Sequence, residues 1–195
     1  GVALNWVANG KLLKENIFDN IWIQPAAGDA GGSLGAALAF WHLEEGKERN
    51  INPDDSMKGS YLGTEYSDDQ ILNELKNLEA NFEVLEYDEI IDKTAECLSK
   101  GNAIGWFQGK MEFGPRALGN RSILCSAADT SINDTLNKRL HRTEFMPFAP
   151  ILRKEDASKY LDISNKVDYK FMTFTLNCKT LMLKHAPAAV HVDKT

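Results

Sequence analysis

The chain has 195 residues, of which 43% are hydrophobic and 26% charged. This composition indicates an ordinary globular protein with one core or two small domains. No run of about 18 apolar residues occurs, and the start of the chain lacks the basic and apolar regions of a secretory signal, so neither a membrane span nor a signal peptide is predicted. The three cysteines form no CxxC pair, which argues against a disulfide framework or zinc ribbon and favours a reducing, cytoplasmic location.

The net charge of −6 is unevenly distributed. Residues 44–92 contain 15 acidic and 4 basic side chains, whereas residues 101–153 contain 7 basic and 4 acidic ones. One interpretation is a solvated acidic region beside an ordinary one. The other is a cationic site in an acidic protein, which suits a small anion better than a long nucleic acid.

The first block of the chain covers residues 1–46. Short buried strands are predicted at 1–5 and 21–25, separated by a short helix or turn. A glycine-rich turn follows, and then a helix of small residues over 34–43 that Gly46 closes.

Residues 47–60 are polar and contain Pro53 and Gly59. This composition predicts a linker and a domain boundary.

The second block begins near residue 61 and alternates helices with strands. Ser67 and Gln70 fit a capping box at the start of its first helix. The prolines of 144–152 predict an extended segment there. Helices are predicted at 66–82, 88–101, 129–140 and 155–161, and strands at 103–107, 122–127 and 169–177.

The glycine-rich motif GDAGGSLGAAL (28–38) could bring backbone N–H groups close to a ligand at a helix N-terminus, where a phosphate is well placed. Asp29 would repel a phosphate there unless it holds a metal or a hydroxyl. The alternative is tight strand-to-helix packing with Asp29 as a cap. Neither common nucleotide fingerprint has this spacing.

The motif GKMEFGPRALGNRSIL (109–124) places Arg116 and Arg121 five residues apart, with Gly114 before them and the Ser122 hydroxyl after them. Two arginine forks can hold one anion, so the motif predicts an anion-binding loop. The alternative is that both arginines pair with local acids such as Glu112.

A third motif, NKRLHRTEFMPFAP (137–150), carries Lys138, Arg139 and Arg142 where a helix ends. Together with the two loop arginines these cations predict a polyphosphate pocket, and the alternative is a solvated basic helix face. His191 could be oriented by Asp193 as a base or as a purely structural histidine. No HxxxH pair is present, so a helical two-histidine metal site is not predicted.

These motifs resemble the O-carbamoyltransferases, the family that includes the nodulation protein NodU and antibiotic-tailoring carbamoyltransferases. The resemblance implies an N-terminal module of the actin-like ATPase superfamily, similar to the tRNA-threonylcarbamoyl transferase, and a C-terminal module similar to YrdC. The implied fold class is α/β (α+β), with a mixed twisted sheet and flanking helices in the YrdC-like module. The segments that carry the resemblance are 1–12, 21–38, 105–124, 137–150 and 186–195.

The resemblance also implies a division of the chain and a reaction. Residues 1–46 match the end of the actin-like module, 47–60 a linker, and 61–195 a YrdC-like module truncated at its C-terminus. Such a module uses carbamoyl phosphate and ATP, with Mg²⁺ on the phosphates, to form carbamoyl adenylate. The actin-like module, which holds iron, then transfers the carbamoyl group to an acceptor hydroxyl.

Family roles carry over to individual positions of this chain. Asp29 matches the aspartate that ligates iron. The residues implied to be catalytic are Arg116, Arg121 and Lys138, and those implied to bind nucleotide or substrate are Gly1, Asn5, Gly114, Ser122, Arg139 and Arg142.

The chain departs from the family pattern in several places. The HxxxH iron ligands are expected upstream of Gly1, Trp6 stands where cysteine is common, and Lys194 stands where glycine is usual. The chain is therefore expected to be a fragment that cannot complete transfer alone. Two other interpretations stay open: a nucleotide- or RNA-binding YrdC-like module without transferase activity, which the net charge argues against, and a structural remnant without a ligand.

Overall fold

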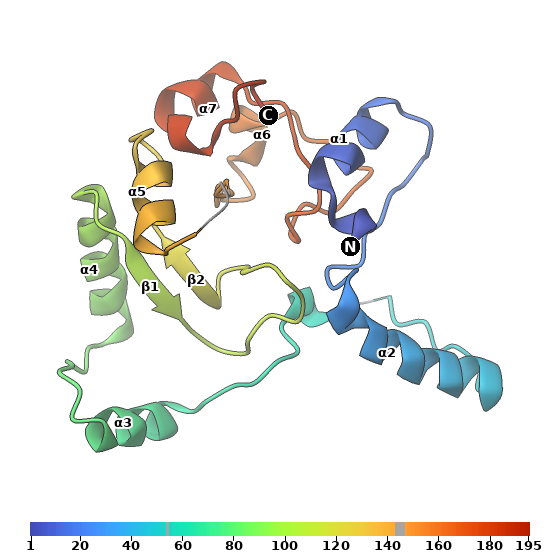
Figure 1. Ribbon diagram of the computed structural model, residues 1–195, viewed down its shortest axis with the longest axis horizontal. Coiled ribbons are helices and arrows are strands. Elements are labelled where there is room, and N and C mark those ends of the chain that lie inside the picture. The colour runs from blue at the N-terminus through green and yellow to red at the C-terminus, as the bar shows by residue number, and fades with distance from the viewer. Residues whose placement is uncertain (54, 143–146) are drawn as a thin grey trace. The chain divides into compact units, whose positions relative to one another are not determined.

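The computed structural model describes residues 1–53, 55–142 and 147–195 (Figure 1). Contacts divide the chain into two compact units. Unit 1 consists of Gly1–Glu65, Gln108–Arg121 and Ser164–Thr175, and unit 2 of Tyr66–Phe107, Ser122–Ile163 and Leu176–Thr195. These contact-based units do not test the division into sequence modules, which stays a prediction. None of the described helices is long and apolar enough to cross a bilayer.

The regular elements of unit 1 are helical among its described residues. They are the 3₁₀-helix η1 (Val2–Leu4), α1 (Trp6–Lys14), α2 (Asp29–Ala39), the π-helical turn η2 (Phe40–Glu44) and the 3₁₀-helix η3 (Lys58–Ser60).

The strands predicted at 1–5 and 21–25 are wrong. The chain instead enters α1 directly after η1, because the Asn5 side chain caps that helix and accepts the Ala8 N–H at 3.0 Å. Asparagine is among the best N-cap residues. A strand needs a neighbouring backbone to pair with, and for the second segment the structure gives one such bond, from Ile21 N–H to the Lys166 carbonyl at 3.2 Å.

The core of unit 1 forms where α1 packs on residues 171–175. Asn9 is buried, and its amide donates to the carbonyls of Ala3 at 2.8 Å and Thr173 at 2.9 Å. A Cβ atom on Gly10 would lie 2.2 Å from the Thr175 hydroxyl oxygen. Asparagine and glycine therefore let the helix approach this segment closely.

The strand predicted at 169–177 is also wrong, since the segment lies outside any named strand. Met172 has a positive φ of 52°, which breaks an extended conformation. Phe171 and Thr173 are buried, with 5% and 2% exposed.

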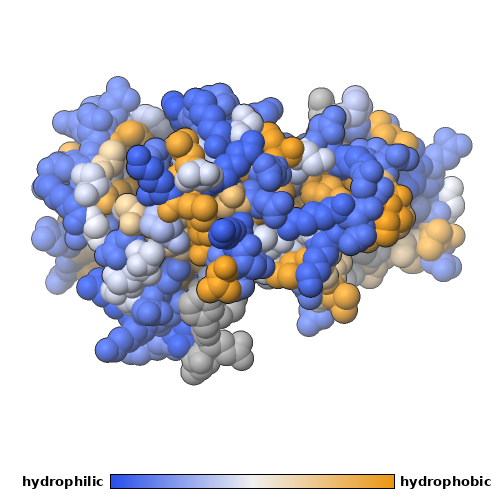
Figure 2. Space-filling model, turned by 90° about the horizontal axis from the view of Figure 1, so that it is seen from above, coloured by the Kyte–Doolittle hydropathy of each residue, from blue (hydrophilic) through white to orange (hydrophobic). Residues whose placement is uncertain are grey.

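Helix α2 begins at Asp29, five residues before the predicted start. A Cβ on Gly31 would lie 2.0 Å from the Ala26 carbonyl oxygen, so the preceding turn packs tightly on the first turn of the helix. No residue of α2 or η2 is buried, and Leu38, Phe40 and Trp41 are exposed. Figure 2 shows hydrophobic side chains among hydrophilic ones on the face that it displays.

The elements of unit 2 include most of those that the sequence predicts. They are α3 (Asp68–Asn77), α4 (Tyr87–Ser99), β1 (Ile104–Phe107), β2 (Arg121–Leu124), α5 (Ile132–Arg139), α6 (Ala157–Tyr160), α7 (Thr180–His185) and the 3₁₀-helix η4 (Pro187–Ala189). The first residue of β2 belongs to unit 1 by contacts. Of these elements, α7 and η4 were not predicted.

The capping box predicted for the first helix of this block is confirmed. The Ser67 hydroxyl accepts the Gln70 N–H at 3.3 Å, and the Gln70 side chain accepts the Ser67 N–H at 2.9 Å. The next helix, α4, starts with an equivalent box between Glu86 and Glu89, and Gly101 follows its end with a φ of 79°.

The described residues form one antiparallel sheet of two strands, β1 and β2 (Figure 1). The structure is therefore mixed α and β but mostly helical, and the wider twisted sheet expected for a YrdC-like module is not seen in these residues. The extended segment predicted at 144–152 falls partly outside the described residues.

The core of unit 2 lies around α5, α7 and η4. Leu136, Met182 and Ala188 are buried. The Asn133 amide donates to the Ala188 carbonyl at 2.7 Å, and the Ala188 N–H donates to the Ala127 carbonyl at 3.0 Å. These bonds fix the start of α5, whose last turn carries Lys138 and Arg139.

Candidate anion-binding site

Residues 60–64 support one side of the arginine-containing loop. The backbones of Gly63 and Thr64 each share a 2.9 Å hydrogen bond with that of Met111. The Ser60 hydroxyl donates to the Phe113 carbonyl at 2.5 Å. The end of the predicted linker thus forms part of the loop's framework.

Glu112 organises the interior of this loop. It is only 7% exposed, and its Oε1 accepts the backbone N–H groups of Leu118 at 2.6 Å, Asn120 at 2.8 Å and Arg121 at 3.3 Å. Burial alone would raise the pKa of Glu112, but these hydrogen bonds outweigh it and leave the pKa below its ordinary value. The carboxylate therefore stays ionised at neutral pH and holds the turn closed.

Tyr61 also holds the loop, because its hydroxyl donates a hydrogen bond to the Leu118 carbonyl at 2.8 Å. Burial, and then the charge of Glu112, raise the pKa of Tyr61. The phenol therefore remains protonated and able to donate at neutral pH.

The guanidinium of Arg121 binds backbone carbonyls. Its Nη1 donates to Gln108 at 2.7 Å and Asn120 at 2.8 Å, and its Nη2 donates to Gly109 at 3.1 Å and Thr64 at 3.3 Å. These four bonds engage both terminal nitrogens. In this geometry Arg121 fixes the shape of the loop, and its predicted catalytic role stays a prediction.

Gly114 brings the loop against the segment that precedes α2. Its φ of 133° lies in a region that favours glycine, and a Cβ there would lie 3.0 Å from the Pro25 carbonyl oxygen. Two sequence motifs that lie far apart along the chain therefore meet at this glycine.

Arg116 extends from the same loop toward the start of the chain. Its Nη2 donates to the Leu4 carbonyl at 3.4 Å, and its guanidinium carbon lies 4.9 Å from the centroid of the Trp6 ring. Its Nε is buried and has no hydrogen-bond partner among the described residues. Of the two predicted loop arginines, Arg116 is thus the one with a buried donor that has no partner in the described ranges.

Gly1 lies close to this arrangement. The Gly1 nitrogen donates to the Ala27 carbonyl at 2.5 Å and would lie 4.0 Å from a Cβ on Gly28, the N-cap of α2. The structure thus brings together the Gly1–Leu4 turn, the segment before α2 and the Gly114–Arg116 part of the loop. Asn5 serves as the cap of α1, as described above.

Asp29 is exposed on the first turn of α2. In the ranges that the structure describes, no three His, Cys, Asp or Glu side chains gather so that they could hold a metal ion. One exposed carboxylate does not make an iron site, so the residues present do not fit iron. No step proposed below passes through it.

The remaining predicted residues lie in unit 2. Ser122 is half-buried on β2. Lys138 and Arg139 are exposed in the last turn of α5, where cations complement the helix dipole. Arg142 lies over the Phe148 ring at 5.1 Å. These three cations are exposed to solvent, and their roles in binding stay predictions.

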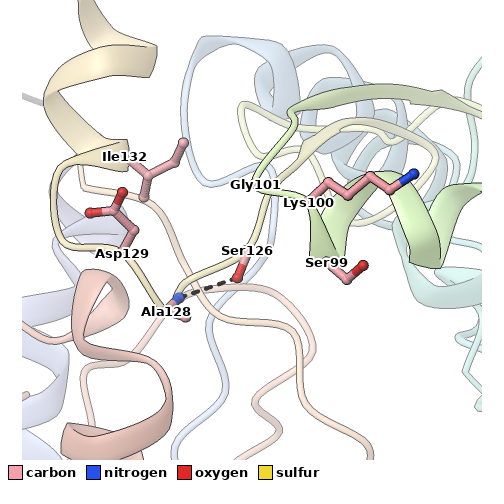
Figure 3. A pocket seen from close by; sticks show the side chains of 7 residues that line it. All are labelled: Ser99, Lys100, Gly101, Ser126, Ala128, Asp129 and Ile132. Atoms are coloured by element: carbon pink, nitrogen blue, oxygen red, sulfur yellow. Dashed lines mark hydrogen bonds between the residues drawn. The ribbon is translucent and has the colours of Figure 1, made fainter.

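A cavity of about 350 Å³ lies between the end of α4 and the start of α5 (Figure 3). Its charged lining residues already have partners: Lys100 pairs with Glu96 at 2.5 Å, and the Asp129 carboxylate accepts the Ser131 N–H at 2.8 Å. None of the seven lining residues is a predicted site residue. The cavity therefore gives no support to the predicted chemistry.

The sequence prediction missed the residues that shape the loop. The sequence indicates Glu112 only as a possible partner of the arginines, and it predicts no role for Ser60 and Tyr61. An acid just before a Gly-Pro turn was the available signal for Glu112, since such turns expose several backbone N–H groups. The Asp193–His191 hydrogen bond is present, at 2.9 Å, but both side chains are exposed.

Two family models match the chain. The model described as Carbamoyltransferase C-terminus matches residues 95–195, and the one described as Carbamoyltransferase N-terminus matches residues 1–38. Together they include every predicted site residue.

Individual relatives give the same result. An uncharacterized protein of Synechocystis is 45% identical over 87% of this chain, and the nodulation protein NolNO of Sinorhizobium fredii is 37% identical over all of it. The 3'-hydroxymethylcephem-O-carbamoyltransferase of Streptomyces clavuligerus is 30% identical over 82% of the chain. The aligned region covers 28% of the length of each of these three relatives.

Proposed function

Because the chain belongs to the carbamoyltransferase family, we propose that it is the part of an O-carbamoyltransferase that binds carbamoyl phosphate and ATP and forms carbamoyl adenylate. The carbamoyl group then passes to the hydroxyl of a small-molecule acceptor. The similarity to a cephem O-carbamoyltransferase supports the general reaction, and it does not identify the acceptor.

The observation that carries this proposal is the environment of Arg116. Its guanidinium lies beside the Gly1–Leu4 turn, with a buried Nε that has no partner in the described parts of the chain. An unpaired buried donor is costly unless a ligand satisfies it. A phosphoryl group offers acceptors that match the arginine fork, so we assign Arg116 to phosphate binding.

Arg121 has a different role in this proposal. Its four carbonyl bonds and the three N–H bonds of Glu112 give the loop a fixed shape before the substrate arrives. Such preorganisation matters because adenylate formation depends mainly on position and charge stabilisation. We therefore propose that Arg121 and Glu112 hold the loop while Arg116 contacts the anion.

The chemistry requires positive charge at two stages. Water first cleaves carbamoyl phosphate to carbamate and inorganic phosphate. A carbamate oxygen then attacks the α-phosphorus of ATP, and pyrophosphate leaves. The acceptor hydroxyl finally attacks the carbamoyl carbon and releases AMP. Negative charge accumulates on phosphoryl oxygens in the first two steps, and we propose that Arg116 stabilises it, with Mg²⁺ bound to the nucleotide phosphates. Lys138 and Arg139 keep the catalytic and binding roles that the family resemblance implies, as proposals.

Other predicted residues keep proposed binding roles. Gly1 and Asn5 are proposed to line the adenosine side, and Gly114 to let the loop backbone approach the ligand. Ser122 and Arg142 are proposed to contact substrate.

Calorimetric titration tests the proposal. The purified chain is titrated with ATP·Mg²⁺ and then with carbamoyl phosphate, in parallel with Arg116→Ala and the matched control Arg49→Ala. Arg49 is an exposed arginine of unit 1 that lies outside the site. The proposal predicts at least about a tenfold weaker binding in Arg116→Ala, as expected when a charged hydrogen-bond donor is lost, and no change in Arg49→Ala. Equal affinity in all three folded proteins would contradict it.

A further inference from the structure

Trp6 has no role in the reaction as proposed, yet it lies against the key arginine. The guanidinium carbon of Arg116 is 4.9 Å from the centroid of the indole ring, which is within the range of a cation–π contact. Trp6 is half-buried, unlike the exposed Trp22 and Trp41 of the same unit.

The indole is attached to a well-supported part of unit 1. Trp6 is the first residue of α1, directly after the Asn5 cap. Its own carbonyl accepts the Thr175 N–H at 3.2 Å, and Gly10, one turn later, lies against the same residue. The backbone that carries the ring is therefore fixed from both sides before any ligand binds.

Stacking an aromatic ring on an arginine does not use up its hydrogen-bond donors. An aromatic ring engages the face of the guanidinium, whereas the five N–H groups point outward in its plane. The Leu4 carbonyl accepts one of these N–H groups, and the buried Nε has no acceptor among the residues described. The Trp6 ring on one face of the guanidinium and the Leu4 carbonyl at one edge thus restrict rotation of the Arg116 side chain and leave its Nε–H available to a ligand.

We propose that Trp6 is a positioning residue that stacks on Arg116 and holds its guanidinium so that its Nε–H, which has no partner among the described residues, faces a bound phosphoryl group. This inference rests on the proposed role of Arg116 in phosphate binding. The phosphoryl group belongs either to carbamoyl phosphate or to ATP, so each is titrated separately.

The test compares Trp6→Leu, which removes the aromatic face, with Trp6→Phe, which keeps one, and with the control Trp22→Leu. We expect Trp6→Leu to weaken binding of one of the two ligands by about 3- to 30-fold, the range of a partly buried cation–π contact. Trp6→Phe is expected to restore most of the affinity, and Trp22→Leu to leave it unchanged. Urea unfolding of each variant confirms that the comparison is made between folded proteins.

Two readouts separate positioning from a general structural role. In the Arg116→Ala background, Trp6→Leu is expected to have no further effect on affinity. The Arg116 Nε–H resonance is expected to show a ring-current shift in the wild type and in Trp6→Phe, and to lose it in Trp6→Leu.

The outcomes distinguish the inference from the function on which it rests. If Arg116→Ala weakens binding and Trp6→Leu does not, the inference is wrong and the proposed function stands. If Trp6→Leu and Trp6→Phe lose affinity equally, or the Trp6→Leu effect persists without Arg116, positioning by stacking is also refuted. If Arg116→Ala binds as well as the wild type, or the wild type binds neither ligand, both proposals fail.

Discussion

Replacing Glu112 gives the sharpest test of how the loop is held. Three backbone N–H groups converge on its Oε1, two of them at 2.6 and 2.8 Å and the third at 3.3 Å. Hydrogen bonds to a charged group contribute about 1.5–3 kcal/mol each. Because the three hydrogen bonds share one oxygen and one of them is long, we assign the lower end of this energy range, about 1.5 kcal/mol, to each of the two short bonds and nothing to the long one. Glu112→Ala should therefore lower the free energy of unfolding by about 3 kcal/mol.

Glu112→Gln keeps an oxygen acceptor and removes the charge. Charge-assisted bonds are roughly twice as strong as neutral ones, so the expected loss is about half, near 1.5 kcal/mol. With a urea m-value of about 2 kcal/mol/M, the two variants should lower the unfolding midpoint by about 1.5 M and 0.7 M. The exposed Glu65 of the same unit is the control, and Glu65→Gln should change the midpoint little.

The pH dependence supplies an independent check. The pKa of Glu112 is lower in the folded protein than its ordinary value of 4.5, so its stabilisation is present above pH 4.5 and is lost as the pH falls below that value. Wild type and Glu112→Gln should therefore differ at pH 7 and converge in acid. A midpoint for Glu112→Ala equal to that of Glu65→Gln at pH 7 would refute the role assigned to the carboxylate.

Further predictions concern close backbone contacts and a buried amide, each measured by urea unfolding. Gly31→Ala should lower the free energy of unfolding by about 2 kcal/mol or more through overpacking, because its Cβ would lie 2.0 Å from the Ala26 carbonyl oxygen. Gly32→Ala is the control in the same helix; a Cβ there would meet nothing within 4 Å, so the change should be neutral or slightly stabilising. Equal effects of the two substitutions would contradict the packing described for α2. Asn9→Ala should lower the free energy of unfolding by about 2 kcal/mol, because the Ala3 and Thr173 carbonyls lose their donor. An unchanged free energy of unfolding would show that the amide is dispensable. Gly114→Ala should lower the free energy of unfolding by about 1–3 kcal/mol and also weaken anion binding, since its φ of 133° and its contact with Pro25 both oppose a side chain. Unchanged anion binding in a folded variant would show that this glycine is not part of the site.

Helices with strong local signals were predictable from the sequence. The capping box of α3 lies within four residues, and α4 and α5 combine apolar spacing with clear ends, so neighbouring residues determine them. Helix α7 was missed because it is short and follows a segment that reads as a strand. Its position depends on packing around Met182, which local sequence does not reveal.

The strands were harder to predict for a physical reason. A strand forms only when another backbone accepts its hydrogen bonds, and that partner is not encoded in the segment itself. The strand β1 has such a partner in β2. The segments 21–25 and 169–177 have strand-like composition without comparable pairing, and Met172 adds a positive φ.

The site was predictable in its residue types but not in its arrangement. Spacing identified two arginines in one loop, and it could not tell which guanidinium would bind backbone carbonyls and which would keep an unpaired donor. The approach of Gly114 to Pro25 and of Arg116 to Leu4 joins segments about 90 to 110 residues apart along the printed chain. Such contacts depend on the folded structure, so the sequence analysis did not predict them.

The central claim is that Arg116 contacts a phosphoryl group of the substrate. Phosphorus-31 NMR of carbamoyl phosphate and of ATP·Mg²⁺, recorded during titration with the chain, tests this contact at the phosphorus atom itself. We predict that the wild-type chain shifts or broadens the resonance of at least one of these ligands, that Arg49→Ala does the same, and that the folded Arg116→Ala variant does not. A resonance that responds identically to the wild type and to Arg116→Ala would contradict the claim.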